Sequence, residues 1–538
     1  MGRLVWLIFA IFLAFSQKCQ GKIEENDVNE GPFKVYRIVP TTGWQLEEMI
    51  RIFENADSEE ADFWHPPSVV NQTVDVMVSP KNTRFFEKFL QNGSFPFEIA
   101  IKDLKKKLIE KEGDEKLSRF SRSGFSRSRR IFVEKIMRDG PGSGLVMGEY
   151  YGYATIVDWM KRIADRMPRL ASILEIGRSA EGRGIFGIKL GHDDGRKPIV
   201  VIDAGIHARE WASIHTAMYF INLMANGHDS DPWIRSYFDN IVLYILPVLN
   251  PDGYEFTRND RTNPRSRMWR KSRSQQRCAW DGQSTKCCHG VDLNRNFDFR
   301  FGEVGASRYP CSEIYHGESA HSEPETRAFA NFLMNLGDRL KGYITLHAYS
   351  QLWIYSYSHR KFTYPANIEE IRNVAARAVA ALGREFGTRY QYGTGPEIIY
   401  AFSGGSTDWA TEKLRVKYSY TLELRPTYEG IIEWNGFVLD KRQLIPTAKE
   451  TWAGVKVVID QIILEYRTKI ARVFRQRVNA EALEKAEQRR ISLKGKCSDE
   501  SQSCLHWRSQ NPDICRTSQS AMLRECPNMC DLCHLVLP

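Results

Sequence analysis

Two histidines and a glutamate in this 538-residue chain have the types and positions that suit a metal ion. His207 and Glu210 form a His-x-x-Glu motif soon after the apolar run 199–202, which is expected to be a buried strand. Imidazole and carboxylate are zinc ligands, and a catalytic zinc takes three protein ligands and keeps one position open. His-x-x-Glu also arises by chance, so a metal site needs a third ligand from elsewhere in the chain.

Spacing alone does not choose the third ligand. His347 is attractive because it ends the expected strand 343–346 and would lie at the same sheet edge as His207. For each of these histidines, a purely structural role is the alternative to binding metal. The competing candidates are His215, His289 and His316.

Three further segments carry side chains that suit an anion or a proton transfer. The segment 269–273 contains two arginines and the segment 291–296 contains one; the arginine fork matches a carboxylate, although surface salt bridges are its more common role. Glu423 lies in the β-forming run 418–424, where a carboxylate is costly unless it has a partner or a function. A general base beside a metal-bound water is the functional interpretation of Glu423.

The elements that must position these residues alternate between strands and helices from about residue 150 to 466. The strand candidates are 199–202, 241–249, 341–346 and 418–424, and the helix candidates are 156–167, 215–224 and 368–386. This order predicts an α/β fold with a mixed, mostly parallel twisted sheet flanked by helices. Active sites in such folds lie beyond the carboxyl ends of the strands.

The N-terminal third predicts a small α+β unit followed by a charged connection. Strands are expected at 34–39, 74–78 and 97–101, and helices at 44–53 and 81–90. Residues 102–130 are charged and serine-rich and end in Arg127-Ser128-Arg129-Arg130. A solvated tether is one interpretation. Cleavage after Arg130 by a processing protease, which would remove an inhibitory unit, is the favoured one.

The first residues and the cysteines point to an oxidising compartment. The apolar run 4–15 has the length of a signal-peptide core and is too short to span a bilayer, so residues 1–21 are expected to be removed. Of eleven cysteines, ten remain after Cys19, an even number that suits disulfides. Sequons stand at Asn71 and Asn92. The net charge of +9 falls largely in a processing segment and a linker, so no nucleic-acid partner is expected.

Eight blocks of the chain resemble the A/B-type zinc carboxypeptidases of the digestive and mast-cell kind. The resemblance is dense from about 150 to 465 and loose in the N-terminal unit. The blocks are 205–211, 250–253, 269–274, 291–297, 310–317, 347–351, 403–409 and 445–452.

The resemblance implies a role for each matching residue. It implies one zinc ion held by His207, Glu210 and His347, with Asp292 orienting the first histidine. Glu423 would be the general base and acid, and Arg273 would stabilise the oxyanion. The substrate's terminal carboxylate would be bound by Asn294, Arg295 and Tyr400, and outer subsites would be formed by Arg209, Tyr349 and Phe437. The implied disulfide is Cys288–Cys311, which leaves Cys278 to pair with Cys287.

The chain departs from the family at Thr407, which matches the floor of the specificity pocket. Thr407 lacks both the acidic group of the basic-preferring members and the large aliphatic group of the hydrophobic-preferring ones. Its hydroxyl favours neutral or apolar C-terminal residues. Ser358 and Gly395 resemble the basic-preferring branch, so a basic preference stays open.

The C-terminal tail resembles the ShK-type six-cysteine module. A short segment with six cysteines cannot build much core, so disulfides are favoured over zinc coordination. The resemblance implies the pairs Cys497–Cys533, Cys504–Cys526 and Cys515–Cys530. A docking or extracellular-matrix partner is expected for this module.

Together these observations predict a secreted, monomeric exopeptidase precursor that acts on the C-termini of peptides and proteins. Its expected parts are a signal peptide (1–21), an activation propeptide (22–130), a catalytic domain (131–466), a basic helical linker (467–496) and the six-cysteine module (497–533). Two rivals are a catalytically dead peptide-binding protein and a protein that acts through its cysteine-rich tail. Neither rival requires the complete set of ligands and base that the chain carries.

Overall fold

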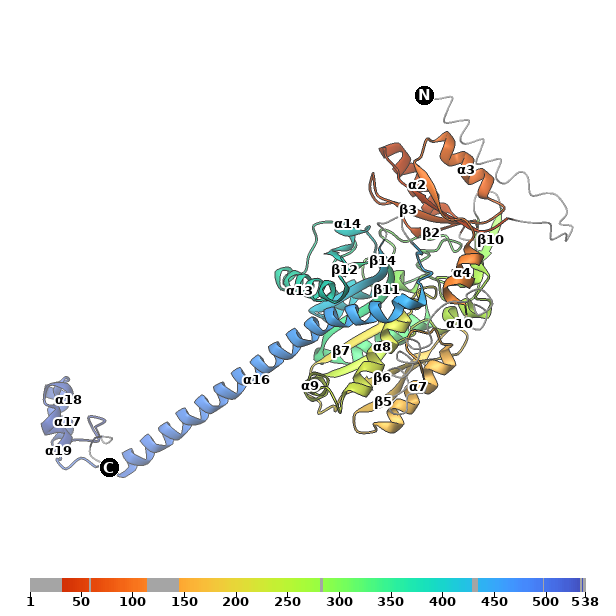
Figure 1. The fold of residues 1–538 in the computed structure, drawn as a ribbon. Coiled ribbons are helices and arrows are strands. Elements are labelled where there is room, and N and C mark those ends of the chain that lie inside the picture. Colours follow the sequence, from red (N-terminus) through yellow and green to blue (C-terminus); the bar gives the residue numbers. More distant parts are fainter. Residues whose placement is uncertain are drawn as a thin grey trace. The chain divides into compact units, whose positions relative to one another are not determined.

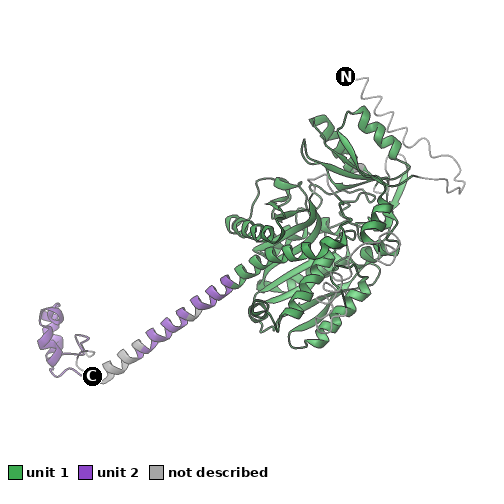
Figure 2. Ribbon diagram, viewed as in Figure 1, with its two compact units in different colours: residues 1–463 green, residues 464–538 purple. Residues whose placement is uncertain are grey.

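The computed structural model describes residues 31–57, 60–113, 145–280, 284–427, 434–496, 498–532 and 535 (Figure 1). These residues divide into two units, 1–463 and 464–538 (Figure 2). The expected signal peptide and the segment Arg127–Arg130 lie outside the described residues.

The N-terminal part of the first unit is a four-stranded antiparallel sheet, with the strand order β2-β3-β1-β4. Apolar side chains from the strands and helices form its own core, which includes Tyr36, Val76 and Leu90. Its elements are β1 (Lys34–Ile38), α2 (Gly43–Asn55), β2 (Ala61–His65), β3 (Val74–Val78), α3 (Thr83–Asn92), β4 (Phe97–Ile101) and α4 (Leu104–Glu112).

Two of these elements differ from the sequence-based prediction. β2 was not predicted, because its polar Asp62 and His65 interrupt the apolar pattern. α4 lies in the segment that composition assigned to a charged connection. It is a helix because Leu104 and Leu108, one turn apart, are both buried, while the lysines between them face outward.

The larger part of the first unit is built on an eight-stranded mixed sheet, ordered β13-β12-β14-β11-β7-β8-β6-β5. Its central strands β14, β11, β7 and β8 are parallel, whereas β5 and β6 form an antiparallel edge. The predicted mixed sheet flanked by helices is confirmed. The strands are β5 (Ala171–Arg178), β6 (Gly184–Leu190), β7 (Ile199–Ala204), β8 (Val242–Leu246), β11 (Leu340–Ser350), β12 (Leu352–Tyr355), β13 (Gln391–Gly393) and β14 (Tyr418–Thr427).

Helices cover this sheet and contribute to its core. α8 (Trp211–Gly227) is buried on nearly all sides and packs against β7, β11 and β14. The remaining helices are α7 (Tyr153–Arg166), α9 (Pro232–Asn240), α10 (Pro251–Asn259), α11 (Pro264–Arg267), η1 (Leu293–Arg295), α12 (Pro324–Asn335), η2 (Gly337–Arg339), α13 (Ile368–Phe386), α14 (Gly395–Ile398), α15 (Ser406–Leu414), η3 (Lys441–Gln443) and α16 (Leu444–Lys496).

A small hairpin, β9 (Arg277–Trp280) and β10 (Thr285–Cys288), is tied to the first unit by disulfides. Cys278 pairs with Cys287 across the hairpin, and Cys288 pairs with Cys311. Both pairings agree with those expected from the sequence.

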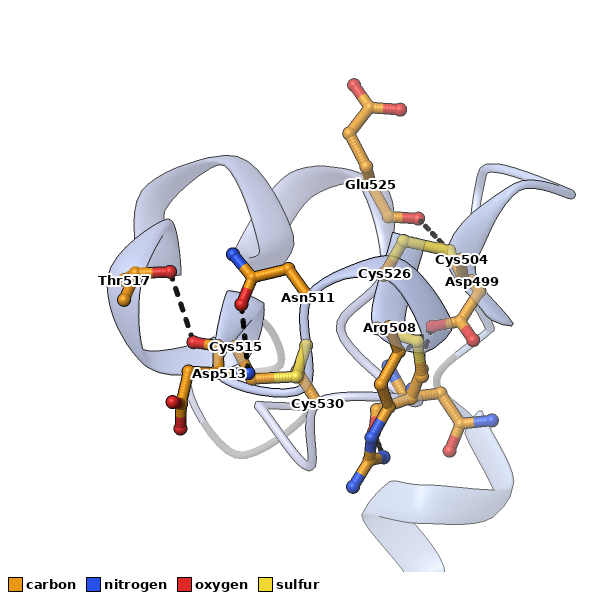
Figure 3. The surroundings of a disulfide bond; sticks show 12 residues. Asp499, Cys504, Arg508, Asn511, Asp513, Cys515, Thr517, Glu525, Cys526 and Cys530 are labelled. Atoms are coloured by element: carbon orange, nitrogen blue, oxygen red, sulfur yellow. Dashed lines mark hydrogen bonds between the residues drawn. A yellow bond between two sulfur atoms is a disulfide. The ribbon is translucent and has the colours of Figure 1, made fainter. Parts of the chain in front are cut away.

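The second unit comprises most of the exposed length of α16 and three short helices, α17 (Cys504–Gln510), α18 (Ile514–Thr517) and α19 (Gln519–Glu525). Disulfides Cys504–Cys526 and Cys515–Cys530 hold the helices together, as expected (Figure 3). The third expected pair, Cys497–Cys533, lies outside the described residues. None of the described helices is both long and apolar enough to cross a bilayer.

Candidate metal centre and substrate cavity

Three buried side chains converge at the carboxyl ends of the central strands. His207 and Glu210 lie in the turn between β7 and α8, and Gly205, with φ of 62°, begins this turn in a conformation that favours glycine. His347 comes from β11, inside the strand and not at its end as predicted. The Nδ1 atoms of the two histidines are 3.1 Å apart, and each lies within 3.0 Å of a Glu210 carboxylate oxygen.

The outer nitrogens of both imidazoles are held by acceptors. His207 Nε2 lies 3.1 Å from Asp292 Oδ1, and His347 Nε2 lies 3.2 Å from Thr345 Oγ1. Each ring therefore has an outer acceptor for its hydrogen and turns its Nδ1 lone pair towards the same point. Burial also lowers the pKa of His207, which favours the neutral form that binds metals. Two imidazole nitrogens and a carboxylate fit a zinc ion.

Glu423 is adjacent to this cluster on the neighbouring strand. The parallel register of β11 and β14 places it directly beside His347. Burial raises the pKa of Glu423 to about 8, against the opposing effect of His347. A cation bound at the cluster would favour the ionised form.

A second group of polar residues forms the other wall of the cavity. Arg295 Nη2 lies 3.3 Å from the Tyr400 hydroxyl, and the Arg295 Nε–H donates to the Gly305 carbonyl at 2.7 Å. The side-chain oxygen of Asn294, Oδ1, accepts a hydrogen bond from the backbone N–H of Ser406 at 3.0 Å. Asn294, Arg295 and Tyr400 all line the same cavity as His207, Glu210 and Glu423.

The structure corrects the assignment of Arg273. Its guanidinium packs over the rings of Phe256 and Trp269, at 3.9 and 4.4 Å from their centroids, and it does not line the cavity. Arg270 occupies the cavity instead, 3.7 Å from Glu210 and 2.9 Å from Asp292. The loop between α11 and β9 turns so that the first arginine of the motif faces the metal cluster and the second faces away.

Thr407 lies behind the cavity wall. It is buried near the start of α15, and its hydroxyl is 3.1 Å from the hydroxyl of Thr421, which lines the cavity. The apolar side chains of Ile354, Ile399 and Phe402 are among those that line the cavity together with Thr421. A Cβ atom at Gly395 would lie 3.1 Å from the Phe402 ring, from Ser358 Cβ and from the Tyr400 carbonyl oxygen, so a larger residue at 395 requires these neighbours to shift slightly.

The N-terminal sheet contacts the three residues expected to form outer subsites. The Asp62 carboxylate accepts from Arg209 at 2.7 and 2.9 Å, and Asp75 accepts from the Tyr349 hydroxyl at 2.8 Å. Phe437 packs edge-to-face on Trp64, with ring centroids 5.2 Å apart. Trp64, His65 and Pro66 themselves line the cavity. The sequence did not indicate these N-terminal contacts.

The fold and the cluster of ligands agree with two family models. Residues 156–454 match the model described as zinc carboxypeptidase, and residues 36–112 match the carboxypeptidase activation peptide. The chain belongs to the zinc carboxypeptidase family and is a metallocarboxypeptidase with an activation peptide. Zinc is its cofactor, and His207, Glu210 and His347 form the site that fits it.

Individual relatives cover both halves of the first unit. The chain is 36% identical to mouse carboxypeptidase A2 over 429 residues, which are 80% of this chain and 93% of the relative. It is also 36% identical to bovine carboxypeptidase B over 416 residues, 77% of this chain and 89% of the relative. The crystal structure of carboxypeptidase A from Helicoverpa armigera is 26% identical and superposes with a TM-score of 0.66, covering 80% of this chain and 98% of that one.

Proposed function

We propose that the chain is the precursor of a secreted carboxypeptidase that removes neutral or apolar residues from the C-termini of peptides and proteins. The observation that carries this proposal is the composition of one cavity. It combines the zinc ligands, the carboxylate of Glu423 and the arginine–tyrosine pair of Arg295 and Tyr400. An enzyme that binds a terminal carboxylate next to a hydrolytic centre acts as an exopeptidase.

Each residue has a task that its surroundings support. Arg295, Tyr400 and Asn294 bind the terminal carboxylate, for which a guanidinium offers two parallel donors. Zinc, when bound, polarises the scissile carbonyl and lowers the pKa of water. Glu423 accepts the proton of the attacking water and delivers it to the leaving amine.

Arg270 takes the role that the sequence analysis gave to Arg273. Its guanidinium faces the cavity and is held by Asp292, whose carboxylate lies 2.9 Å away. A preorganised cation at this point stabilises the negative charge that develops on the carbonyl oxygen. Asp292 therefore orients both His207 and Arg270.

The preference for neutral or apolar C-terminal residues is supported by the lining of the cavity. Ile354, Ile399 and Phe402 are apolar, and the Thr407 hydroxyl is close to that of Thr421. The nearest carboxyl in the sequence, Asp408, accepts from the Ser358 N–H at 2.7 Å, and burial raises its pKa to about 7. A group that is only partly ionised at neutral pH selects poorly for lysine or arginine.

Inhibition by the propeptide is supported by the contacts of β2 and β3. Asp62 and Asp75 bind Arg209 and Tyr349, which would otherwise be available to the substrate. Cleavage after Arg130 is supported by the sequence Arg127-Ser128-Arg129-Arg130. Secretion rests on the apolar run 4–15 and the disulfides, and the tail is proposed to be an ShK-type module that binds an extracellular partner.

The deciding experiment compares peptides that end in Phe, Leu, Lys and Arg as substrates of the processed enzyme. We expect release of Phe and Leu with kcat/KM at least tenfold above that for Lys and Arg. Thr407→Asp should shift the preference towards Lys and Arg, with Thr411→Asn on the same helix as the matched control. A wild-type enzyme that prefers Lys or Arg would establish the alternative, basic preference.

Chelation separates the active enzyme from the catalytically dead alternative. Removing zinc should abolish hydrolysis, and adding zinc should restore it. Glu423→Gln should keep zinc bound and lose turnover, because an amide cannot accept the proton of water. A variant with near-normal turnover would place the base elsewhere.

A further inference from the structure

Asp203 is a buried carboxylate for which the proposed mechanism has no use. It belongs to β7, has no solvent exposure, and lies in the middle of the sheet below the metal cluster. Burial raises the pKa of Asp203 to about 6. Since an ionised carboxylate is expensive in such a place, its presence calls for a compensating interaction.

The side chain of Thr345 connects Asp203 to a metal ligand. Thr345 Oγ1 lies 3.1 Å from Asp203 Oδ2 and 3.2 Å from His347 Nε2. The parallel register of β7 and β11 pairs Thr345 with Asp203, and Thr345 and His347 are two residues apart on one strand. Side chains two residues apart in a strand share a face, so the three groups form a row.

The chemistry of the row fixes the direction of both hydrogen bonds. An ionised carboxylate only accepts, and a hydroxyl has a single hydrogen to donate. The Thr345 hydrogen is therefore directed to Asp203, and its oxygen is left to accept from His347 Nε2–H. That arrangement leaves Nδ1 of His347 without a hydrogen, 3.0 Å from Glu210 Oε2 and 3.1 Å from His207 Nδ1.

We propose that Asp203 is a positioning residue that acts through Thr345 to hold His347 in the tautomer that binds zinc. His207 receives the same support directly from Asp292, whereas His347 receives it through a hydroxyl relay. Without Asp203, the Thr345 hydroxyl is free to donate to Nε2, and the hydrogen of the ring then moves to Nδ1, where zinc must bind. This inference rests on His347 being a zinc ligand, as proposed above.

The first test breaks the relay at Thr345 and measures zinc affinity of the full-length precursor by competition with a chromophoric chelator at one pH. Thr345→Val should weaken zinc binding about tenfold or more, as expected when the outer partner of a ligating histidine is lost. Thr345→Ser keeps the hydroxyl and should stay within about threefold of wild type. Thr216→Val, a buried threonine of α8 that donates to the Ala212 carbonyl at 2.9 Å, is the matched control.

The second test asks whether Asp203 acts through Thr345 in a double-mutant cycle. Asp203→Asn should weaken zinc binding in the wild-type background and have no further effect in the Thr345→Val background, because the relay is already broken. Thermal unfolding of the metal-free variants shows whether any change is a general loss of stability. If Thr345→Val does not fold, zinc affinity is compared between Asp203→Asn and Thr345→Ser instead. Only Asp203→Asn is expected to bind zinc more weakly than wild type.

Two results overturn the proposal, and one separates it from the proposed function. Zinc affinity unchanged in Thr345→Val, or effects of Asp203→Asn and Thr345→Val that add, would show that no relay operates. His347→Ala serves as the reference and should lose zinc binding by far more than either variant. Tight zinc binding by His347→Ala would instead refute the ligand assignment itself.

Discussion

Arg270 and Arg273 stand three positions apart in one loop and have opposite surroundings. Replacing Arg270 by Gln should lower kcat/KM about 10²–10³-fold, because one preorganised donor to the developing oxyanion is lost. Arg273→Gln, the matched control, should leave kcat/KM within a few-fold, because Arg273 packs over the rings of Phe256 and Trp269 beside Glu181 and is not among the described residues that line the cavity. Steady-state kinetics on one peptide decides the assignment, and a larger loss in Arg273→Gln would reverse it.

At the residue scale, the sequence alone made His347 one of several candidates for the third ligand, and the resemblance to the zinc carboxypeptidases implied the set His207, Glu210 and His347 that the structure brings together. Glu423 was singled out because a carboxylate is costly in a β-forming run, and the strand register places it beside His347. Arg270 was missed because it lies in a loop, where no periodicity tells which of two arginines faces inward. Asp203 and Thr345 gave no signal, since their roles depend on the register of two strands distant in sequence.

Glu325 predicts a pH effect on stability that is separate from catalysis. It lies in α12, where one oxygen accepts from the Ala180 N–H at 2.9 Å, and burial raises its pKa from 4.5 to about 7. The folded chain thus holds the proton more tightly than the unfolded chain. Stability from this group is present below pH 4.5 and is lost as the pH rises to 7.

Glu325→Gln should therefore gain stability over wild type as the pH rises. The free energy of unfolding of Glu325→Gln minus that of wild type should change little below pH 4.5. It should have risen by about 3 kcal/mol above pH 7, since each pKa unit is worth about 1.4 kcal/mol. Denaturant unfolding of both proteins between pH 4 and 8 measures it. A difference that does not change with pH would contradict the prediction.

At the scale of elements, α4 of the propeptide forms a deeply buried ion pair with the catalytic part. Glu112 accepts from Arg267 of α11 at 2.7 and 2.6 Å, and both side chains are almost fully buried. Breaking such a pair leaves a buried charge without its partner, which costs about 3–5 kcal/mol. Because the pair joins the propeptide to the catalytic part, breaking it should weaken the binding of the cleaved propeptide to the catalytic part.

Glu112→Gln should raise the dissociation constant of the cleaved propeptide about 100-fold or more. The measurement is the peptidase activity recovered when the cleaved complex is diluted. Glu110→Gln, an exposed residue of the same helix, is the matched control and should leave the dissociation constant unchanged. Equal affinities for the two variants would show that this ion pair does not hold the propeptide.

Elements were predicted where the apolar period was regular and missed where polar residues interrupted it. β1, β3, β4 and α13 follow such periods and were expected close to their observed bounds. α4 was hidden by a lysine-rich composition, although the spacing of Leu104 and Leu108 was a usable signal. β2 carries the polar Asp62 because Asp62 binds Arg209 of the catalytic part, and this need cannot be read from the propeptide alone.

For the whole molecule, the boundary between the catalytic part and the tail falls inside one helix. The catalytic domain was expected to end at residue 466, where large apolar residues become rare, with a basic helical linker at 467–496; in the structure both segments belong to one continuous helix, α16, which ends at Lys496. Its later residues are mostly Ala, Arg, Lys, Glu and Gln, which form helices well without packing against anything. Composition therefore marks where packing stops, not where the helix stops.

Removing residues 467–538 should leave peptidase activity intact. Every cavity-lining residue belongs to the first unit, so kcat/KM of the processed, truncated enzyme should stay within about twofold of the full-length enzyme.

Truncation after Gly454 is the contrasting variant, because it also removes Val455, Val458, Ile459 and Ile462, which are buried. At about 1.5–3 kcal/mol each, their loss is comparable to the whole stability of a domain of about 5–15 kcal/mol, so this variant should not fold. Circular dichroism and peptidase assays distinguish the two truncations. Loss of activity on removing residues 467–538 from a folded enzyme would mean that the cysteine-rich tail takes part in catalysis and is not only a docking module.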